Sequence, residues 1–126
     1  MPRLQRLLHF AGIGIILLIW ALSLMPLSNF VPPGGDKLHH FIAYGSLMLV
    51  WVLATPRQTM WQRSAMALGF MAMGLAIEFA QGLTPYRFFE WTDARANALG
   101  VLLGWALGMW LQRLDFIRSR TAAAAD

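Results

Sequence analysis

Residues 7–25 read LLHFAGIGIILLIWALSLM, a run of mostly apolar side chains that contains no charged residue. An α-helix needs about 20 such residues to cross the hydrocarbon core of a bilayer. The run follows the basic segment MPRLQR, as in a secretory signal, but it is longer than a signal core and no clear small-residue cleavage site follows it. We therefore predict a retained membrane-spanning helix that ends at Pro26, because proline cannot continue the hydrogen bonds of a helix.

Three more apolar blocks follow, at about 37–54, 65–83 and 93–111. Their lengths predict an all-α, polytopic membrane protein with four transmembrane helices, in a single domain over residues 1–126. The segment PLSNFVPPGGD predicts a loop before the second helix, which Asp36 could cap, and either Thr92 or Asp93 could cap the fourth. The closing TAAAAD is expected to be frayed.

The composition indicates that lipid is the solvent. Of the 126 residues, 58% are hydrophobic and only 13% are charged, whereas soluble domains are about a quarter charged. The net charge of +4 does not indicate nucleic-acid binding, because the basic residues are spread between the apolar blocks and form no cluster with aromatic residues. The absence of cysteine excludes disulfides, thiolate zinc sites and cysteine nucleophiles.

The basic residues also predict an orientation, since Lys and Arg near helix ends remain on the cytoplasmic side. Seven of them fall on one side of the apolar blocks and three on the other. Both termini are therefore expected in the cytoplasm, which requires an even number of crossings and agrees with four helices. The seven are Arg3, Arg6, Arg57, Arg63, Arg113, Arg118 and Arg120, and the three are Lys37, Arg87 and Arg95.

The second predicted helix carries unusual polar residues on one face. Asp36, His40 and Tyr44 are four residues apart, a step that turns only about 40° around a helix, and Lys37 borders this face. A charged group near the bilayer centre costs at least about 2.5–3.5 kcal/mol by insertion scales, so it usually faces protein or a water-filled cavity. These residues therefore indicate a polar site.

The third and fourth predicted helices carry matching residues. Glu78 and Gln81 are neighbours at spacing three, and Asp93 and Asn97 are neighbours at spacing four. With the predicted topology, Arg87 lies in the loop between these helices, and the polar faces meet at the non-cytoplasmic side. Such a set of carboxylates, imidazole, phenol, amides and cations suits acid–base chemistry or the binding of an anionic head group.

A stripe of small residues continues along the fourth helix at spacing four: Gly100, Gly104 and Gly108. Small residues let another helix approach closely, so the stripe predicts helix packing rather than ligand binding. The spacing alone does not say which helix packs there, and an oligomer formed through this stripe is left open.

The charged residues also have simpler structural explanations. Asp36 and Asp93 could only cap their helices, and Lys37 and Arg87 could only anchor the helix ends in the membrane interface. His40 and the carboxylates could act as metal ligands, but their spacing is not of the zinc type, so we predict no metal site. The sequence identifies no cofactor.

The chain resembles the VanZ-like family of small membrane proteins through three stretches: DKLHHFIAYGSL at 36–47, GLAIEFAQGLTPYR at 74–87 and TDARANALGVLLG at 92–104. The family pattern is an Asp-Lys pair followed by His and Tyr, then Glu and Gln near the end of the third helix. An Arg, an Asp and an Asn then lead into a fourth helix that contains glycine. The matching positions are Asp36, Lys37, His40, Tyr44, Glu78, Gln81, Arg87, Asp93, Asn97, Gly100 and Gly104.

The resemblance implies a multi-pass protein of the bacterial inner membrane. The family takes its name from a protein linked to low-level resistance to the glycopeptide teicoplanin, and no reaction is securely assigned to the family. Two hypotheses follow. Either the polar cluster binds and modifies an anionic envelope lipid or lipid-linked cell-wall intermediate, or it binds such a partner without catalysis and alters envelope organisation. Transport fits less well, because the polar residues stop in the outer third of the bilayer.

The first hypothesis gives each residue a role. His39 stands beside His40, and the spacing from Asp36 and Tyr44 favours His40 as the imidazole of the site. Proton transfer would fall to His40, Glu78, Asp36 and Asp93, substrate binding to Lys37, Tyr44, Gln81, Arg87 and Asn97, and helix packing to the three glycines of the stripe.

Overall fold

The computed structural model describes residues 2–26 and 36–123, and every regular element within them is an α-helix. The all-α prediction is therefore confirmed for the described residues. Of the predicted loop, residues 27–35 lie outside them, as do residues 124–126 of the predicted frayed end. The four helices are α1 (Pro2–Leu24), α2 (Asp36–Ala54), α3 (Met60–Gly82) and α4 (Trp91–Ala123).

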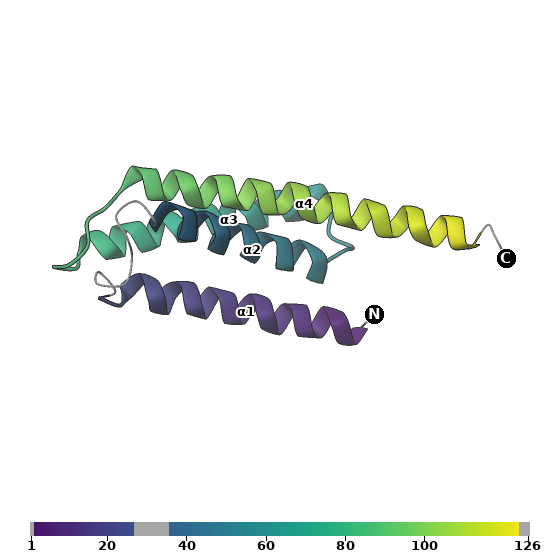
Figure 1. Ribbon diagram of the computed structural model, residues 1–126, viewed down its shortest axis with the longest axis horizontal. Helices are drawn as coiled ribbons and strands as arrows, with labels where there is room; N and C mark the ends of the chain where they lie inside the picture. The colour runs from purple at the N-terminus through teal and green to yellow at the C-terminus, as the bar shows by residue number, and fades with distance from the viewer. Residues whose placement is uncertain (1, 27–35, 124–126) are drawn as a thin grey trace.

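Three of these helices, α1, α2 and α3, are long and apolar enough to cross a membrane. α4 is not among them, because Asp93, Arg95 and Asn97 lie in its first two turns and lower its hydropathy. That α4 crosses the membrane, that both termini are cytoplasmic and that the chain forms a single domain remain predictions. The first turn of α1 and the last turns of α4 do lie toward the same end of the molecule (Figure 1).

Two helices begin earlier than hydropathy predicts. α1 starts already at Pro2, since proline is accepted in the first turn of a helix, where its missing N–H is not needed. α3 starts at Met60 instead of about Ala65, because Thr59 caps it. The Thr59 side chain accepts a hydrogen bond from Gln62 N at 3.3 Å, and Gln62 Oε1 accepts one from Thr59 N at 2.9 Å. This capping box extends the helix into a polar segment.

α4 differs from its prediction at both ends. It continues to Ala123 instead of ending near Leu111, because the following residues include good helix formers and neither Pro nor Gly. At its start, neither Thr92 nor Asp93 is the residue before the helix, since both lie inside its first turn. Asp36 is likewise the first residue of α2 rather than a cap that precedes it.

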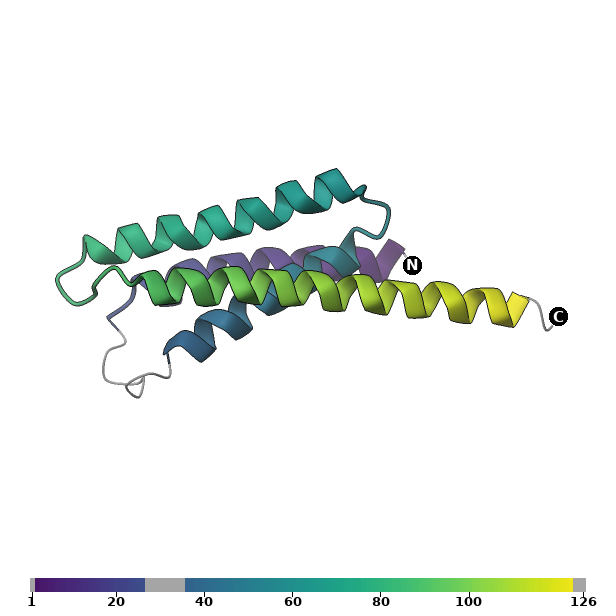
Figure 2. The same ribbon diagram turned by 90° about the horizontal axis from the view of Figure 1, so that it is seen from above.

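The helices form an elongated bundle in which α2 crosses obliquely while α1, α3 and α4 follow the long axis (Figures 1 and 2). α2 packs most extensively against α4 and next against α1, and α3 packs mainly against α4. α1 is the most loosely held of the three apolar helices, with 11% of its span buried against 33% for α2 and 28% for α3. Most of the surface of α1 is therefore left for lipid.

Glycines set the distance between α2 and α4. Gly45 on α2 faces Gly100 and Gly104 on α4. A Cβ atom added to Gly100 would overlap with the carbonyl oxygen of Phe41, and one added to Gly104 would overlap with the carbonyl oxygen of Gly45. Gly108 continues the contact one turn further along α4. The stripe thus lies against α2 of the same chain, and an oligomer formed through it remains a prediction.

A buried arginine joins the helices at the end where α2 stops and α3 begins. Arg63 on α3 is 7% exposed. Its Nη2 donates to the carbonyl oxygen of Pro56 at 3.1 Å and to Oε1 of Gln112 on α4 at 2.8 Å. Gln112 Nε2 in turn donates to the carbonyl oxygen of Val52 at 2.7 Å. Arg63 therefore fastens the connection between α2 and α3 to α4, in addition to its predicted part in setting the orientation.

Candidate functional site

The polar residues of α2, α3 and α4 gather at the end of the bundle where α2 and α4 begin and α3 ends. Except for Glu90, every member of this group is a residue predicted from the sequence to belong to the site. We define the polar-end cluster as Asp36, Lys37 and His40 of α2, Glu78 of α3, Arg87 and Glu90 of the segment before α4, and Asp93 and Asn97 of α4.

His40 lies at the centre of the polar-end cluster and is 9% exposed. Its Nδ1 lies 3.0 Å from Oδ1 of Asn97, so a hydrogen bond joins α2 to α4. Its Nε2 faces two carboxylates, at 3.6 Å from Asp93 Oδ2 and 3.9 Å from Glu78 Oε1. An imidazole held against two carboxylates is positioned to donate or accept a proton.

Both of these carboxylates are buried, Glu78 at 0% exposed and Asp93 at 4%. Glu78 Oε2 accepts a long hydrogen bond from the backbone N of Glu90 at 3.4 Å. Glu78 Oε1 and Asp93 Oδ1 have no hydrogen-bond donor within the described residues. Leaving a buried polar atom unsatisfied costs about 1–3 kcal/mol, and more for a charged group. These two oxygens are therefore available to a ligand.

Two cations border the polar-end cluster. Lys37 Nζ lies 3.4 Å from Glu90 Oε2 and 3.8 Å from Asp93 Oδ1, and Arg87 Nη1 lies 3.4 Å from Asp36 Oδ2. Glu90 was not predicted from the sequence to belong to the site. Its position three residues before Asp93 could have indicated it, because this spacing brings two side chains together at the start of a helix.

Tyr44 and Asn97 lie next to each other inside the bundle, and each is 1% exposed. Gly74 on α3 makes room for them, because a Cβ atom there would lie 2.9 Å from Asn97 Nδ2 and 3.2 Å from Tyr44 Cε1. The Tyr44 hydroxyl and Asn97 Nδ2 have no hydrogen-bond partner in the described part of the chain. The contact of Gly74 could not be predicted from the sequence, since one glycine in an apolar helix does not indicate which side chains lie against it.

Gln81 is placed differently from the other predicted site residues. Its Nε2 donates to the carbonyl oxygen of Ser23 at 2.8 Å, and the hydroxyl of Tyr86 donates to the carbonyl oxygen of Leu24 at 2.8 Å. The last carbonyls of a helix lack partners within the helix, so these two donors satisfy the end of α1. Gln81 therefore holds α1 in place instead of turning toward His40.

An amphipathic cavity of about 520 Å³ opens beside the polar-end cluster, between α1 and α2. This volume lies in the ordinary range of small-molecule sites, about 300–1,000 Å³. One end is charged, and the walls are largely apolar side chains of the two helices. The charged end is lined by Asp36, His39, His40 and Arg87, and the walls by Ile15, Leu18, Ile19, Leu22, Ile42 and Ala43, with Tyr44 and Ser46.

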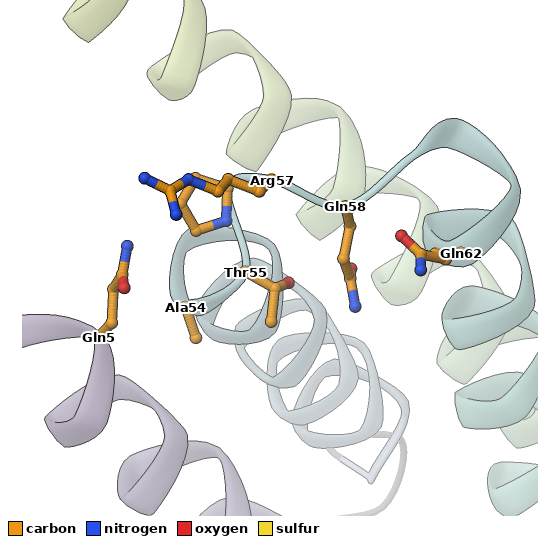
Figure 3. A pocket seen from close by; sticks show the side chains of 7 residues that line it. Gln5, Ala54, Thr55, Arg57, Gln58 and Gln62 are labelled. Atoms are coloured by element: carbon orange, nitrogen blue, oxygen red, sulfur yellow. The ribbon is translucent and has the colours of Figure 1, made fainter. Parts of the chain in front are cut away.

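A second cavity, of about 490 Å³, lies at the opposite end of the bundle (Figure 3). Figure 3 shows amide side chains and one arginine around it, contributed by α1, the connection between α2 and α3, and α3. Neither a carboxylate nor an imidazole is among the described residues that line it. The first cavity is therefore the better candidate for chemistry. The lining residues of the second are Gln5, Ala54, Thr55, Pro56, Arg57, Gln58 and Gln62.

A protein-family model with the description VanZ/LLP1 matches residues 3–112 of the chain. The matched region contains the whole polar-end cluster and the glycine stripe. No curated protein and no solved structure matches the chain.

Proposed function

Because the chain belongs to the VanZ/LLP1 family, we propose that it is an integral protein of the bacterial inner membrane that binds and modifies an anionic envelope lipid or lipid-linked cell-wall intermediate. The head group would lie at the polar-end cluster on the non-cytoplasmic face, and a hydrocarbon chain would lie in the cavity between α1 and α2. His40 and Glu78 would transfer a proton to or from the bound head group.

The cavity is the observation that carries this proposal. Its charged end and apolar walls match the two parts of a lipid, and Arg87 supplies a planar donor for phosphate or carboxylate. Arg87 now contacts Asp36 at 3.4 Å, a distance too long for a strong ion pair, so an anionic head group could compete for it. A hydrocarbon chain gains little by moving from the bilayer to a protein groove. Selectivity must therefore come from the charged end.

The geometry around His40 supports chemistry in addition to binding. An imidazole and a buried phenol, of His40 and Tyr44, line the cavity, and the buried carboxylate of Glu78 lies behind the imidazole at 3.9 Å. The Tyr44 hydroxyl and Glu78 Oε1 have no hydrogen-bond partner among the described residues. General acid–base catalysis by positioned groups of this kind typically contributes about 10²–10⁴-fold to a rate. Such unsatisfied groups are costly in a site whose only task is to pack helices.

A second candidate function is binding without catalysis. The contacts of His40 favour it, because its bond to Asn97 and its approach to Glu78 and Asp93 link α2 to both α3 and α4. In this case the imidazole and carboxylates would hold the helices together, while Lys37 and Arg87 hold the anion. Envelope organisation would then change without any altered lipid.

Filling the cavity tests the binding step. Ala43→Phe places a ring in the space between α1 and α2, and we expect at least a tenfold loss in lipid that co-purifies with the protein in mild detergent, equivalent to about 1.4 kcal/mol. Native mass spectrometry of the purified protein measures this. The matched control is Ala72→Phe, which adds the same ring to an exposed position of α3. Equal lipid retention by the two variants would contradict the proposed location.

Removing one carboxylate charge tests the chemistry. Glu78→Gln keeps the size of the side chain but cannot accept a proton, so we expect the lipid or cell-wall precursor that depends on the protein to disappear from the profile. Comparative lipidomics and precursor analysis of strains with matched amounts of membrane protein measure this. The control is Asp115→Asn, an exposed acidic position near the other end of the bundle.

The same strains separate the two candidate functions. If the deletion strain and the wild-type strain have identical lipid and precursor profiles, the enzymatic proposal fails. If the profiles are identical but teicoplanin susceptibility changes with Arg87→Ala and not with His40→Asn, the non-catalytic binding function is the better description.

A further inference from the structure

We propose that Asp36, His40 and Asp93 form a binding site for a divalent transition-metal ion. One ligand atom from each of the three side chains lies within 4.8 Å of the other two. This site goes beyond the proposed lipid function and does not require it, since a metal ion can bind there whether or not a lipid occupies the cavity.

The hydrogen bond of His40 directs its second nitrogen toward the carboxylates. Asn97 Oδ1 only accepts hydrogen bonds, so a proton on His40 Nδ1, at 3.0 Å from it, completes this hydrogen bond. In a neutral imidazole, Nε2 then has a lone pair, and this lone pair faces Asp93 Oδ2 and Glu78 Oε1 at 3.6 and 3.9 Å. These three electron-rich atoms repel one another unless a proton or a metal ion lies between them, so the position suits a cation. Metal-binding histidines typically have this arrangement, with the other ring N–H donated to an oxygen.

The distances suit a small metal ion. Zinc lies about 2.0–2.1 Å from a histidine nitrogen and about 2.0–2.2 Å from a carboxylate oxygen, which puts two tetrahedral ligands roughly 3.3–3.5 Å apart. His40 Nε2 and Asp93 Oδ2 are already 3.6 Å apart. The third ligand, on Asp36, needs only a side-chain adjustment, because it lies on the exposed border of the cluster and is half-buried.

A second observation is that carboxylates outnumber the cations. Four acidic side chains, on Asp36, Glu78, Glu90 and Asp93, face only Lys37 and Arg87 in the polar-end cluster, so acidic side chains outnumber basic ones by two. A divalent cation would take the place of protons on such a set of buried acids. Glu78, which is fully buried, also directs its unpartnered Oε1 toward the same His40 nitrogen. The excess of acidic side chains and the unpartnered oxygen both favour cation binding at this position.

The donor atoms indicate the class of metal. One imidazole nitrogen with carboxylate oxygens suits zinc, manganese, iron or cobalt, whereas magnesium and calcium prefer oxygen alone. A bound divalent cation would also explain how an anionic head group can approach a cluster that has excess negative charge. Sequence spacing did not reveal this set, because two ligands are four residues apart on α2 and the third comes from α4.

Titration of the metal-free, detergent-purified full chain with Zn²⁺ tests the proposal, with Co²⁺ absorption as a spectroscopic probe of nitrogen and oxygen ligation. We expect one equivalent of Zn²⁺ per chain. His40→Gln should weaken the affinity by at least about 100-fold, and Asn97→Ala, which removes only the acceptor behind the imidazole, by about 10–100-fold. The matched control is His9→Gln, a histidine of α1 that lies outside the polar-end cluster and contacts the carbonyl oxygen of Gln5, which should bind as the wild type does.

Circular dichroism of each metal-free variant shows that the helices are intact, and only variants with wild-type helix content are compared. Absence of saturable Zn²⁺ binding to the wild type would overturn the proposal. It would equally be overturned if His40→Gln kept its affinity or if His9→Gln lost as much. The titration contains no added lipid, so this failure is distinct from failure of the lipid-retention experiment.

Discussion

Gly104→Ala is expected to lower the free energy of unfolding by about 1–3 kcal/mol, the usual cost of forcing extra atoms into a packed interface. The added Cβ would overlap with the carbonyl oxygen of Gly45 and lie 3.0 Å from its carbonyl carbon and 3.1 Å from Leu49 N. These are backbone atoms, so no side-chain rotation can relieve the overlap. Denaturant titration in mixed micelles, followed by tryptophan fluorescence, measures the change.

Two other glycines provide matched controls. Gly69 and Gly14 have nothing within 4 Å of an added Cβ atom. Alanine there should be neutral or should stabilise the helix by up to about 1 kcal/mol, because it restricts the unfolded backbone more than glycine does. If Gly104→Ala behaved as Gly69→Ala does, the close approach of α2 to α4 would be wrong.

Arg63→Ala is expected to have the second large effect. It should lower the free energy of unfolding by about 1.5–3 kcal/mol, the usual contribution of hydrogen bonds to a charged group. The substitution removes the donor at 2.8 Å from Gln112 Oε1 and at 3.1 Å from the carbonyl oxygen of Pro56. Both acceptors then lose this partner, and the connection between α2 and α3 loses its link to α4. The same denaturant titration measures the change.

Arg57→Ala is the control, because this arginine lies in the connection that Arg63 joins to α4 but is itself exposed. Both substitutions remove one positive charge from the same side of the bundle, so an effect on membrane orientation would be equal for both. We expect Arg57→Ala to change stability by no more than about 0.5 kcal/mol, as is usual at surface positions. If Arg57→Ala lowered the free energy of unfolding as much as Arg63→Ala does, the loss of charge would explain the effect, and the hydrogen bonds of Arg63 would not.

The helices and most of the polar-end cluster could be predicted from the sequence for clear physical reasons. Apolar blocks near 20 residues long indicate the solvent of each segment, and helical spacing brings Asp36, His40 and Tyr44 to one face. Alternating helix direction then brings the start of α2 beside the end of α3 and the start of α4. The burial of these side chains does not by itself establish what they do, so their catalytic and binding roles stay predictions.

Other features could not be predicted, because hydropathy indicates whether a segment lies in lipid or in water. It does not indicate which residues of other helices contact that segment. The first turn of α3 includes the polar residues Gln62 and Arg63, and the capping box that begins the helix depends on local hydrogen bonds between Thr59 and Gln62. Gln81 shares the end of α3 with Glu78, yet it turns to a carbonyl of α1. Which of these two polar side chains faces the cluster depends on where α1 and α2 lie relative to α3, which periodicity does not determine.

The low burial of α1 has a consequence for evolution. To the polar end, α1 contributes backbone carbonyls and an apolar wall, while the described charged side chains there come from α2, α3, α4 and the segment before α4. Under the proposed function, the charged side chains would recognise the head group, and α1 would supply one wall of the space for a hydrocarbon chain, with Ile42 and Ala43 of α2 on the other side. Substitutions in α1 would then alter which chain lengths are accepted while the charged residues stay constant, so one scaffold could diversify its lipid preference.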